Sequence, residues 1–143
     1  MREIKRSALV AQPPARMFAL INDIERYPQF VPWVTHARIE SQTATEIVAT
    51  LGVKRGALHT EFTTRNILEP DSHVTLNLVK GPFNHFEGEW RLTPIGAAGC
   101  RVELTLRFSF ASRLSAVVLE PLFESTAATL VDAFVARARA QPA

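Results

Sequence analysis

The sequence lacks the features that mark several common classes of protein. Its 143 residues include a single cysteine, Cys100, which excludes an internal disulfide and a zinc site built from several cysteines. No run approaches the roughly 18 apolar residues of a membrane-spanning helix, and the apolar stretch 7–11 is too short for a signal-peptide core. Repeats, low-complexity tracts and flexible linkers are also missing. We therefore expect one domain, residues 1–143, in the cytoplasm, with peripheral contact to the inner membrane left open.

An excess of charge of one sign is missing as well. The sequence has 16 Lys and Arg against 14 Asp and Glu, and this net charge of +2 is too small to indicate nucleic-acid binding. Most cations are arginines, and six of them fall where strands are expected to face outward: Arg38, Arg55, Arg65, Arg91, Arg101 and Arg107. These side chains are either paired with glutamates on a solvated sheet face or available to contact phosphates.

Apolar periodicity predicts the order of helices and strands. Residues 2–11 are predicted to form a strand, 14–22 a short amphipathic helix that begins at Pro14, and 24–30 a second short helix. Six strands are predicted at 34–42, 45–54, 57–69, 73–80, 85–94 and 100–110, and a long helix at 112–139, in which Pro121 predicts a kink or a restart. The fold class is therefore α+β: a curved antiparallel sheet of about seven strands wrapped on a long C-terminal helix, with two short helices after the first strand. We expect a pocket where the sheet curls round the long helix.

The titratable residues show no catalytic or metal-binding motif. The four histidines lack metal-ligand spacing, and Glu87 and Glu89 alternate with aromatic residues, which places both carboxylates outside the sheet. We therefore expect no metal, catalytic cofactor or catalytic residue. The polar residues expected to face inward are uncharged: Thr60, Thr64, Asn66, Asn77, Thr126 and Thr129. The threonines either bond to the backbone of their own element or help to bind the head group of a ligand.

Large apolar side chains supply the candidate binding residues. These residues are expected to face one another between the sheet and the long helix. They are Trp33, Phe62, Leu76, Phe83, Trp90, Phe108, Phe110, Leu119, Leu122, Phe123, Thr126 and Leu130. These residues form either a dry core or the wall of an apolar cavity. Trp33 follows Pro32 in a stiff segment between a helix and a strand, so it acts either as a plug or as a gate.

Six short blocks of sequence, in this order and at these spacings, resemble a known family. The blocks are Asp23–Pro32, Phe62–Asn66, Gly81–Phe83, Gly88–Pro94, Cys100–Glu103 and Val131–Ala138. Together they make the chain, from about Ile4 to Ala138, similar to the RatA and coenzyme Q-binding family of the START-like, helix-grip superfamily. Pro121 departs from the family pattern.

The resemblance implies a function as well as a fold. It implies an elongated apolar cavity that binds ubiquinone or a related polyisoprenoid lipid and supports respiratory electron transport without catalysis. The alternative is a ribosome association toxin that blocks the joining of ribosomal subunits, and the block Phe62–Asn66 and the chain length are more similar to that branch. A third alternative is a cyclase-type enzyme, because the superfamily includes cyclases. The implied partners are accordingly a quinone or lipid, a membrane surface, and a ribosomal subunit.

Overall fold

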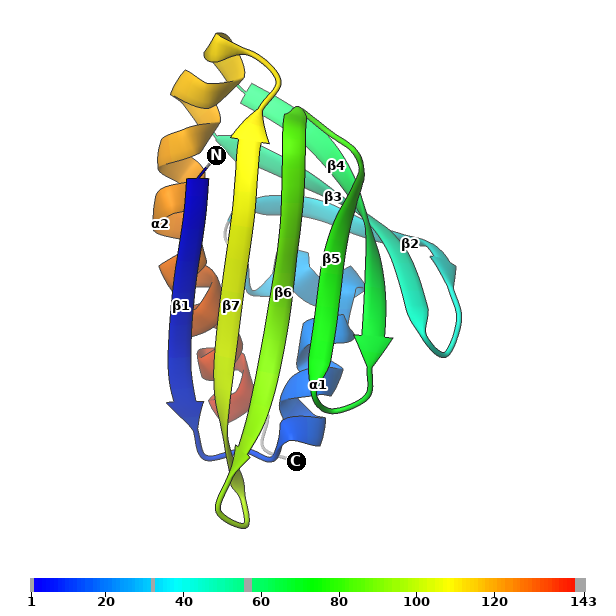
Figure 1. Ribbon diagram of the computed structural model, residues 1–143, viewed down its shortest axis with the longest axis vertical. Coiled ribbons are helices and arrows are strands. Elements are labelled where there is room, and N and C mark those ends of the chain that lie inside the picture. Colours follow the sequence, from blue (N-terminus) through cyan, green and yellow to red (C-terminus); the bar gives the residue numbers. More distant parts are fainter. Residues whose placement is uncertain (1, 32, 56–57, 141–143) are drawn as a thin grey trace.

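The computed structural model describes residues 2–31, 33–55 and 58–140, which form one strongly curved sheet with helices on one side (Figure 1). Within these ranges, the side chains of residues 55, 58, 115, 118, 119 and 122–128 lie outside the description. Along the chain come β1 (Arg2–Val10), α1 (Pro14–Asn22), η1 (Ile24–Gln29), β2 (Val34–Gln42), β3 (Glu46–Arg55), β4 (Leu58–Glu69), β5 (His73–Lys80), β6 (Phe83–Ile95), β7 (Gly99–Phe110) and α2 (Arg113–Ala140). The predicted α+β class is confirmed, and α1 has the predicted bounds.

The sheet brings the two ends of the strand series together. Its order is β1-β7-β6-β5-β4-β3-β2, and every neighbouring pair is antiparallel. The first and last strands of the chain therefore lie side by side (Figure 1). α2 packs against β1 and β7, α1 packs against α2, β6 and β7, and η1 packs against β2. This arrangement closes a space between the inner face of the sheet and the helices.

The long helix is continuous where the sequence predicts an interruption. α2 runs from Arg113 to Ala140 with Pro121 inside it, so the expected restart of the helix at this proline is wrong. A proline removes one backbone donor from a helix, and α2 also packs on β1 and β7, which offsets this local cost.

The last strand shows how the alternation of side chains builds the core. Val102, Leu104 and Phe108 on one face of β7 are fully buried, whereas Arg101 and Arg107 on the other face are exposed. This confirms the predicted strand with one wet face. Burial of each large apolar side chain is worth roughly 1.5–3 kcal/mol, so the inner face of β7 is a main source of stability.

Candidate functional site

A cavity of about 80 Å³ lies between the sheet and the helices. Strands β3 to β7 supply most of its wall, Ile21 and Asn22 close it from the end of α1, and Leu130 and Phe134 close it from α2. Most of the lining side chains are apolar. The predicted pocket between the sheet and the long helix is therefore present, at the level of the second half of α2.

Part of the predicted set of binding residues lies on this wall. Trp33, Phe62, Leu76, Trp90 and Leu130 line the cavity. The predicted residues Leu119, Leu122, Phe123 and Thr126 have side chains outside the described part of the chain. Whether the five lining residues bind a ligand remains a prediction.

Three predicted wall residues belong instead to a packed aromatic cluster. Phe83 stacks on Phe110 with 5.1 Å between ring centroids, and Phe108 lies edge-on to Phe110 at 5.4 Å. Phe83, Phe108 and Phe110 are not among the described residues that line this cavity, and their contact with a ligand stays a prediction. Phe108 is the cross-strand partner of Phe86, and the pair Phe83 and Phe110 lies nearer the end of the sheet, where its rings pack together.

The cavity wall carries a small set of uncharged polar groups. Thr64 and Asn66 of β4 face inward as predicted, and the Thr64 hydroxyl donates to Oδ1 of Asn66 at 2.7 Å. The other predicted inward residues do not join them: Asn77 and Thr129 are exposed, Thr60 is half-buried away from the cavity, and Thr126 lies outside the described side chains. Asn22 also lies on the wall and was not predicted from the sequence. Its side chain reaches the wall because α1 ends there.

Aromatic side chains form the end of the cavity beneath α1. Tyr27 packs edge-on against Phe134 with 5.3 Å between centroids, and Phe134 in turn packs edge-on against Trp90 at 5.2 Å. The Tyr27 hydroxyl donates to the carbonyl oxygen of Ile21, which ties η1 to α1. Burial, with a smaller contribution from the nearby Asp23, raises the pKa of Tyr27 far above its ordinary value. Tyr27 is therefore a neutral hydrogen-bond donor in the neutral pH range.

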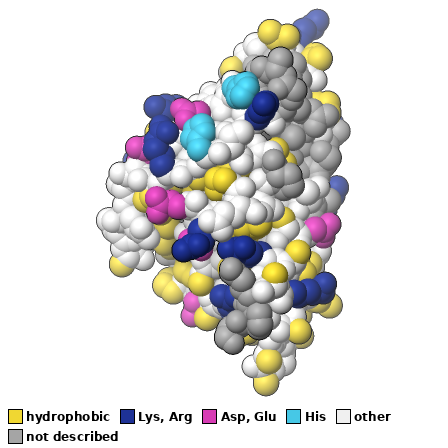
Figure 2. Space-filling model, turned by 180° about the vertical axis from the view of Figure 1, so that it is seen from behind, with side chains coloured by type: hydrophobic (Ala, Val, Ile, Leu, Met, Phe, Trp, Pro, Cys, Tyr) yellow, Lys and Arg dark blue, Asp and Glu magenta, His cyan; other side chains and the backbone are white. Residues whose placement is uncertain are grey.

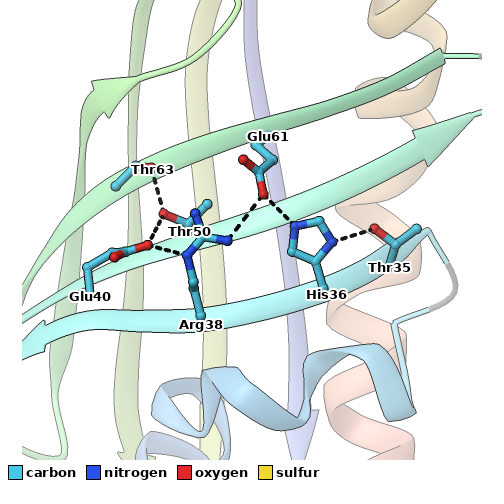
Figure 3. Close-up of polar contacts among 7 residues, drawn as sticks. All are labelled: Thr35, His36, Arg38, Glu40, Thr50, Glu61 and Thr63. Atoms are coloured by element: carbon cyan, nitrogen blue, oxygen red, sulfur yellow. Dashed lines mark hydrogen bonds and ion pairs between the residues drawn. The ribbon is translucent and has the colours of Figure 1, made fainter.

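A chain of polar contacts crosses β2, β3 and β4 outside the cavity (Figure 3). His36 Nε2 lies 2.5 Å from Glu61 Oε2, and Arg38 Nε donates to Glu40 Oε1 at 2.5 Å. The hydrogen bond from His36 holds the pKa of Glu61 below its ordinary value, and the hydrogen bond from Arg38 does the same for the pKa of Glu40. The contacts continue through Glu40 to the buried Thr50 hydroxyl. Because the charged members are about half exposed, this network is part of the solvated surface of the sheet.

The outward arginines are paired with glutamates across the strands. Arg65 lies 2.8 Å from Glu46, and Arg107 lies 2.6 Å from Glu3. Arg38 lies beside Glu40 of its own strand and 3.3 Å from Glu61 of β4, and Arg91 lies 3.9 Å from Glu89 of its own strand. Arg101 is exposed, and the side chain of Arg55 lies outside the description. The pairing favours the first of the two interpretations, a solvated face of mixed charge. Figure 2 shows further Lys and Arg side chains beside exposed apolar atoms on the opposite side, which bears the helices.

The described ranges lack a metal-binding cluster and a membrane-spanning helix. Among residues 2–31, 33–55 and 58–140, no group of three or more His, Cys, Asp and Glu side chains is placed to hold a metal ion. In the same ranges, no helix combines the length and the hydropathy that crossing a membrane requires.

Comparison with solved structures defines the class of fold. A protein of Thermus thermophilus superposes with a TM-score of 0.86 at 18% identity, covering 99% of this chain and 100% of that one. The Zhui aromatase/cyclase of a Streptomyces species superposes with a TM-score of 0.85 at 20% identity, covering 99% and 96%. A START superfamily protein of Mycobacterium smegmatis superposes with a TM-score of 0.79 at 18% identity, covering 94% and 95%. The architecture is therefore the START-like helix-grip fold.

Comparison of sequences narrows this class to a family. Residues 10–135 match the family described as polyketide cyclase/dehydrase and lipid transport. Ribosome association toxin RatA of Pseudomonas aeruginosa is 40% identical, covering 95% of this chain and 94% of that protein, and RatA of Escherichia coli is 37% identical, covering 97% and 88%. The mitochondrial coenzyme Q-binding protein coq10 of Schizosaccharomyces pombe is 24% identical, covering 93% and 84%. The chain belongs to the polyketide cyclase/dehydrase and lipid transport family, in the group that includes the RatA and coenzyme Q-binding proteins.

Proposed function

We propose that this protein binds a ring-bearing apolar molecule in the cavity, with ubiquinone or a related polyisoprenoid quinone as the natural ligand, and carries it without chemical change. The observation that supports this proposal is a mostly apolar wall interrupted by the amide and hydroxyl groups of Asn22, Thr64 and Asn66. Such groups orient a ligand through hydrogen bonds and do not transfer protons readily at neutral pH. The distant relative named as a coenzyme Q-binding protein supports the same class of ligand.

The volume of the cavity limits what it holds without rearrangement. At about 80 Å³ it is smaller than the roughly 150 Å³ of an engineered protein cavity that admits benzene. Entry of a quinone ring therefore requires part of the wall to move. Trp33 is the candidate for this movement, because it lines the cavity, is partly exposed and lies in the connection between η1 and β2 rather than in a strand. This favours the gate among the two roles predicted for Trp33.

The two tryptophans of the chain make the binding proposal directly measurable. Trp33 and Trp90 are the only tryptophans in the sequence, and both line the cavity. A short-chain ubiquinone bound there is expected to quench the intrinsic fluorescence with a saturable dependence on concentration. The same ligand is expected to raise the melting temperature, because it binds the folded state alone. Absence of both effects would contradict the proposal.

A cavity-filling variant separates binding in the cavity from adsorption to the surface. Ala49 is buried on the cavity wall, and Ala49→Leu adds three carbon atoms that project into this space. The variant is expected to weaken quenching by the quinone at least tenfold, a change of about 1.4 kcal/mol in binding free energy. Ala15→Leu adds the same atoms on the exposed face of α1 and serves as the matched control, with unchanged quenching. Equal affinities in the two variants would place the quinone elsewhere.

A second function, inhibition of ribosomal subunit joining, is favoured by the identities of 40% and 37% to proteins named ribosome association toxin. If this chain acts in the same way, excess protein added to separated subunits is expected to reduce the fraction that joins, measured by sucrose-gradient sedimentation. Contacts to ribosomal phosphates would make the effect weaken steeply as salt rises. Unchanged gradients at low salt would exclude this function.

The charged faces of the molecule offer a way to locate such an interface. Arg65 on the sheet face is paired with Glu46, whereas Arg139 lies exposed in the last turn of α2. We expect Arg139→Glu to lower the activity on ribosomal subunits more than Arg65→Glu does, because an unpaired cation is free to contact phosphate. The reverse order would assign the sheet face instead.

A further inference from the structure

Two buried polar atoms on the cavity wall have no hydrogen-bond partner among the described residues. They are Oδ1 of Asn22 and the indole Nε1 of Trp33. Buried polar atoms in folded proteins are nearly always paired with protein or with water. Leaving one unpaired costs roughly 1–3 kcal/mol, so each of the two atoms favours a molecule that can bond to it.

The chemistry of both atoms is fixed by their surroundings. Nδ2 of Asn22 donates to the carbonyl oxygen of Phe18 at 2.9 Å, a contact that the oxygen of the amide cannot make. Oδ1 is therefore the atom left without a partner, and it is an acceptor. The indole nitrogen of Trp33 carries a hydrogen and is a donor only. The wall thus offers one unused acceptor and one unused donor.

A third group on the same wall adds a donor. The Thr64 hydroxyl donates to Oδ1 of Asn66 at 2.7 Å, and this bond orients the amide of Asn66 with its nitrogen as the remaining donor. Asn66 is buried and lines the cavity. The residues that line the cavity thus supply two donors, from Trp33 and Asn66, and one acceptor, from Asn22, which takes a hydrogen from a ligand.

We infer that the cavity selects apolar ring molecules that carry a hydroxyl group, such as a phenol or hydroquinone, over molecules of similar shape whose oxygens are only carbonyls or ethers. A hydroxyl oxygen accepts from Trp33 or Asn66, and its hydrogen is donated to Oδ1 of Asn22. A carbonyl or ether oxygen satisfies the donors and leaves Oδ1 of Asn22 without a partner. The inference rests on the proposed binding function and states which ligands that site prefers. For a quinone, the preferred ligand is the reduced form, the hydroquinone.

Two probes that differ by one methyl group on the oxygen test this preference on the unaltered chain. The probes are para-propylphenol and its methyl ether, whose binding is measured by calorimetric titration. The phenol is expected to bind about tenfold more tightly, because the ether leaves one buried acceptor unpaired. Equal affinities would overturn the inference and leave the binding function in place, since water in the cavity would then satisfy Asn22. Failure of both probes and of ubiquinone to bind would overturn the binding function itself.

Three variants assign the preference to particular atoms. Asn22→Leu removes the acceptor. It is expected to lower the affinity for the phenol to that for the ether and to leave the affinity for the ether unchanged. Trp33→Phe removes the donor and is expected to weaken both probes. Asn84→Leu changes an exposed asparagine of β6 and is the matched control, with both affinities unchanged. A phenol preference that survives in Asn22→Leu would overturn the assignment, and the probe comparison on the unaltered chain remains decisive if this variant fails to fold.

Discussion

The imidazole of His36 lies so close to the backbone of Gly52 that a Cβ at position 52 would come within 2.0 Å of its Cε1 atom. The two residues are partners across the β2–β3 pair, and the ring passes over Gly52 to reach Glu61 on β4 (Figure 3). A glycine at this position therefore permits a histidine on one strand to bond with a carboxylate two strands away.

Replacing this glycine is expected to break the contact between His36 and Glu61. In Gly52→Ala the exposed imidazole rotates away from the new methyl group, because no other atom there can yield as easily. The pKa of Glu61 is then expected to rise toward its ordinary value, since the hydrogen bond from His36 is the largest cause of its depression. Carboxyl-carbon NMR titration measures this change. Glu40, whose pKa is held down chiefly by Arg38, is the internal control, and an unchanged Glu61 would contradict the prediction.

Acid is expected to destabilise the protein through the same kind of contact. Four glutamates have pKa values below the ordinary 4.5 because of their nearest partners: Glu3 beside Arg107, Glu40 beside Arg38, Glu61 beside His36 and Glu89 beside His73. Unfolding removes the partners, so the unfolded chain binds more protons in this range, and the stability falls as pH drops from about 4.5 through the lower folded-state values.

Urea unfolding midpoints between about pH 7 and about pH 3 measure this dependence. The midpoint is expected to fall toward the acid end. Salt near 1 M is expected to flatten the dependence only in part, because the screening length of about 3 Å is longer than these contacts of 2.5–2.8 Å. A midpoint that rises with acidity would show that these carboxylates are not stabilised in the folded state.

Phe134 connects α2 to the segment of η1 and to the sheet. Its ring lies edge-on to Tyr27, Phe30 and Trp90 at centroid distances of 5.3, 5.2 and 5.2 Å, and it is fully buried. Phe134→Ala is expected to lower the free energy of unfolding by about 3–5 kcal/mol, measured by denaturant titration. Leu114→Ala changes a side chain of the same helix that is 75% exposed, and its effect is expected to stay within about 0.5 kcal/mol. Similar effects of the two substitutions would mean that α2 is not docked through Phe134.

The fold could be predicted from the sequence because its signals are local. Pro14 and Asn22 bound α1 where predicted, and the alternation from Val102 to Phe108 identifies the inner face of β7. Of the two outcomes predicted at Pro121, the restart is wrong, because the cost of a proline in a helix is local, whereas α2 also packs on the strands β1 and β7. The kink stays a prediction.

The site was less predictable, because the alternation of apolar and polar residues shows which face of a strand a side chain lies on but not which part of the interior it reaches along the strand. Phe83 and Trp90 lie on the same face of β6, yet Trp90 lines the cavity and Phe83 fills the end of the sheet. Tyr27 and Asn22 line the cavity because of how η1 and α1 pack against the rest of the fold. The sequence periodicity of such short helices does not predict that packing. The inward placement of Thr64 and Asn66 was predictable, since both lie on a long strand with a clear register.

Cys100 is expected to react with thiol reagents only when the native structure opens. Its side chain is 1% exposed, and burial raises the pKa of its thiol, so both access and the thiolate fraction are low. The labelling rate with iodoacetamide, followed by mass spectrometry, is expected to be far below that of an unfolded thiol and to rise with urea in step with unfolding. Ser41→Cys in a Cys100→Ser background places a thiol at an exposed position of β2 and is the control, expected to react at the rate of a free thiol. If Cys100 reacts as fast as this control without denaturant, the edge where β7 begins opens in the native state, and the packing of that end of the sheet is looser than its burial indicates.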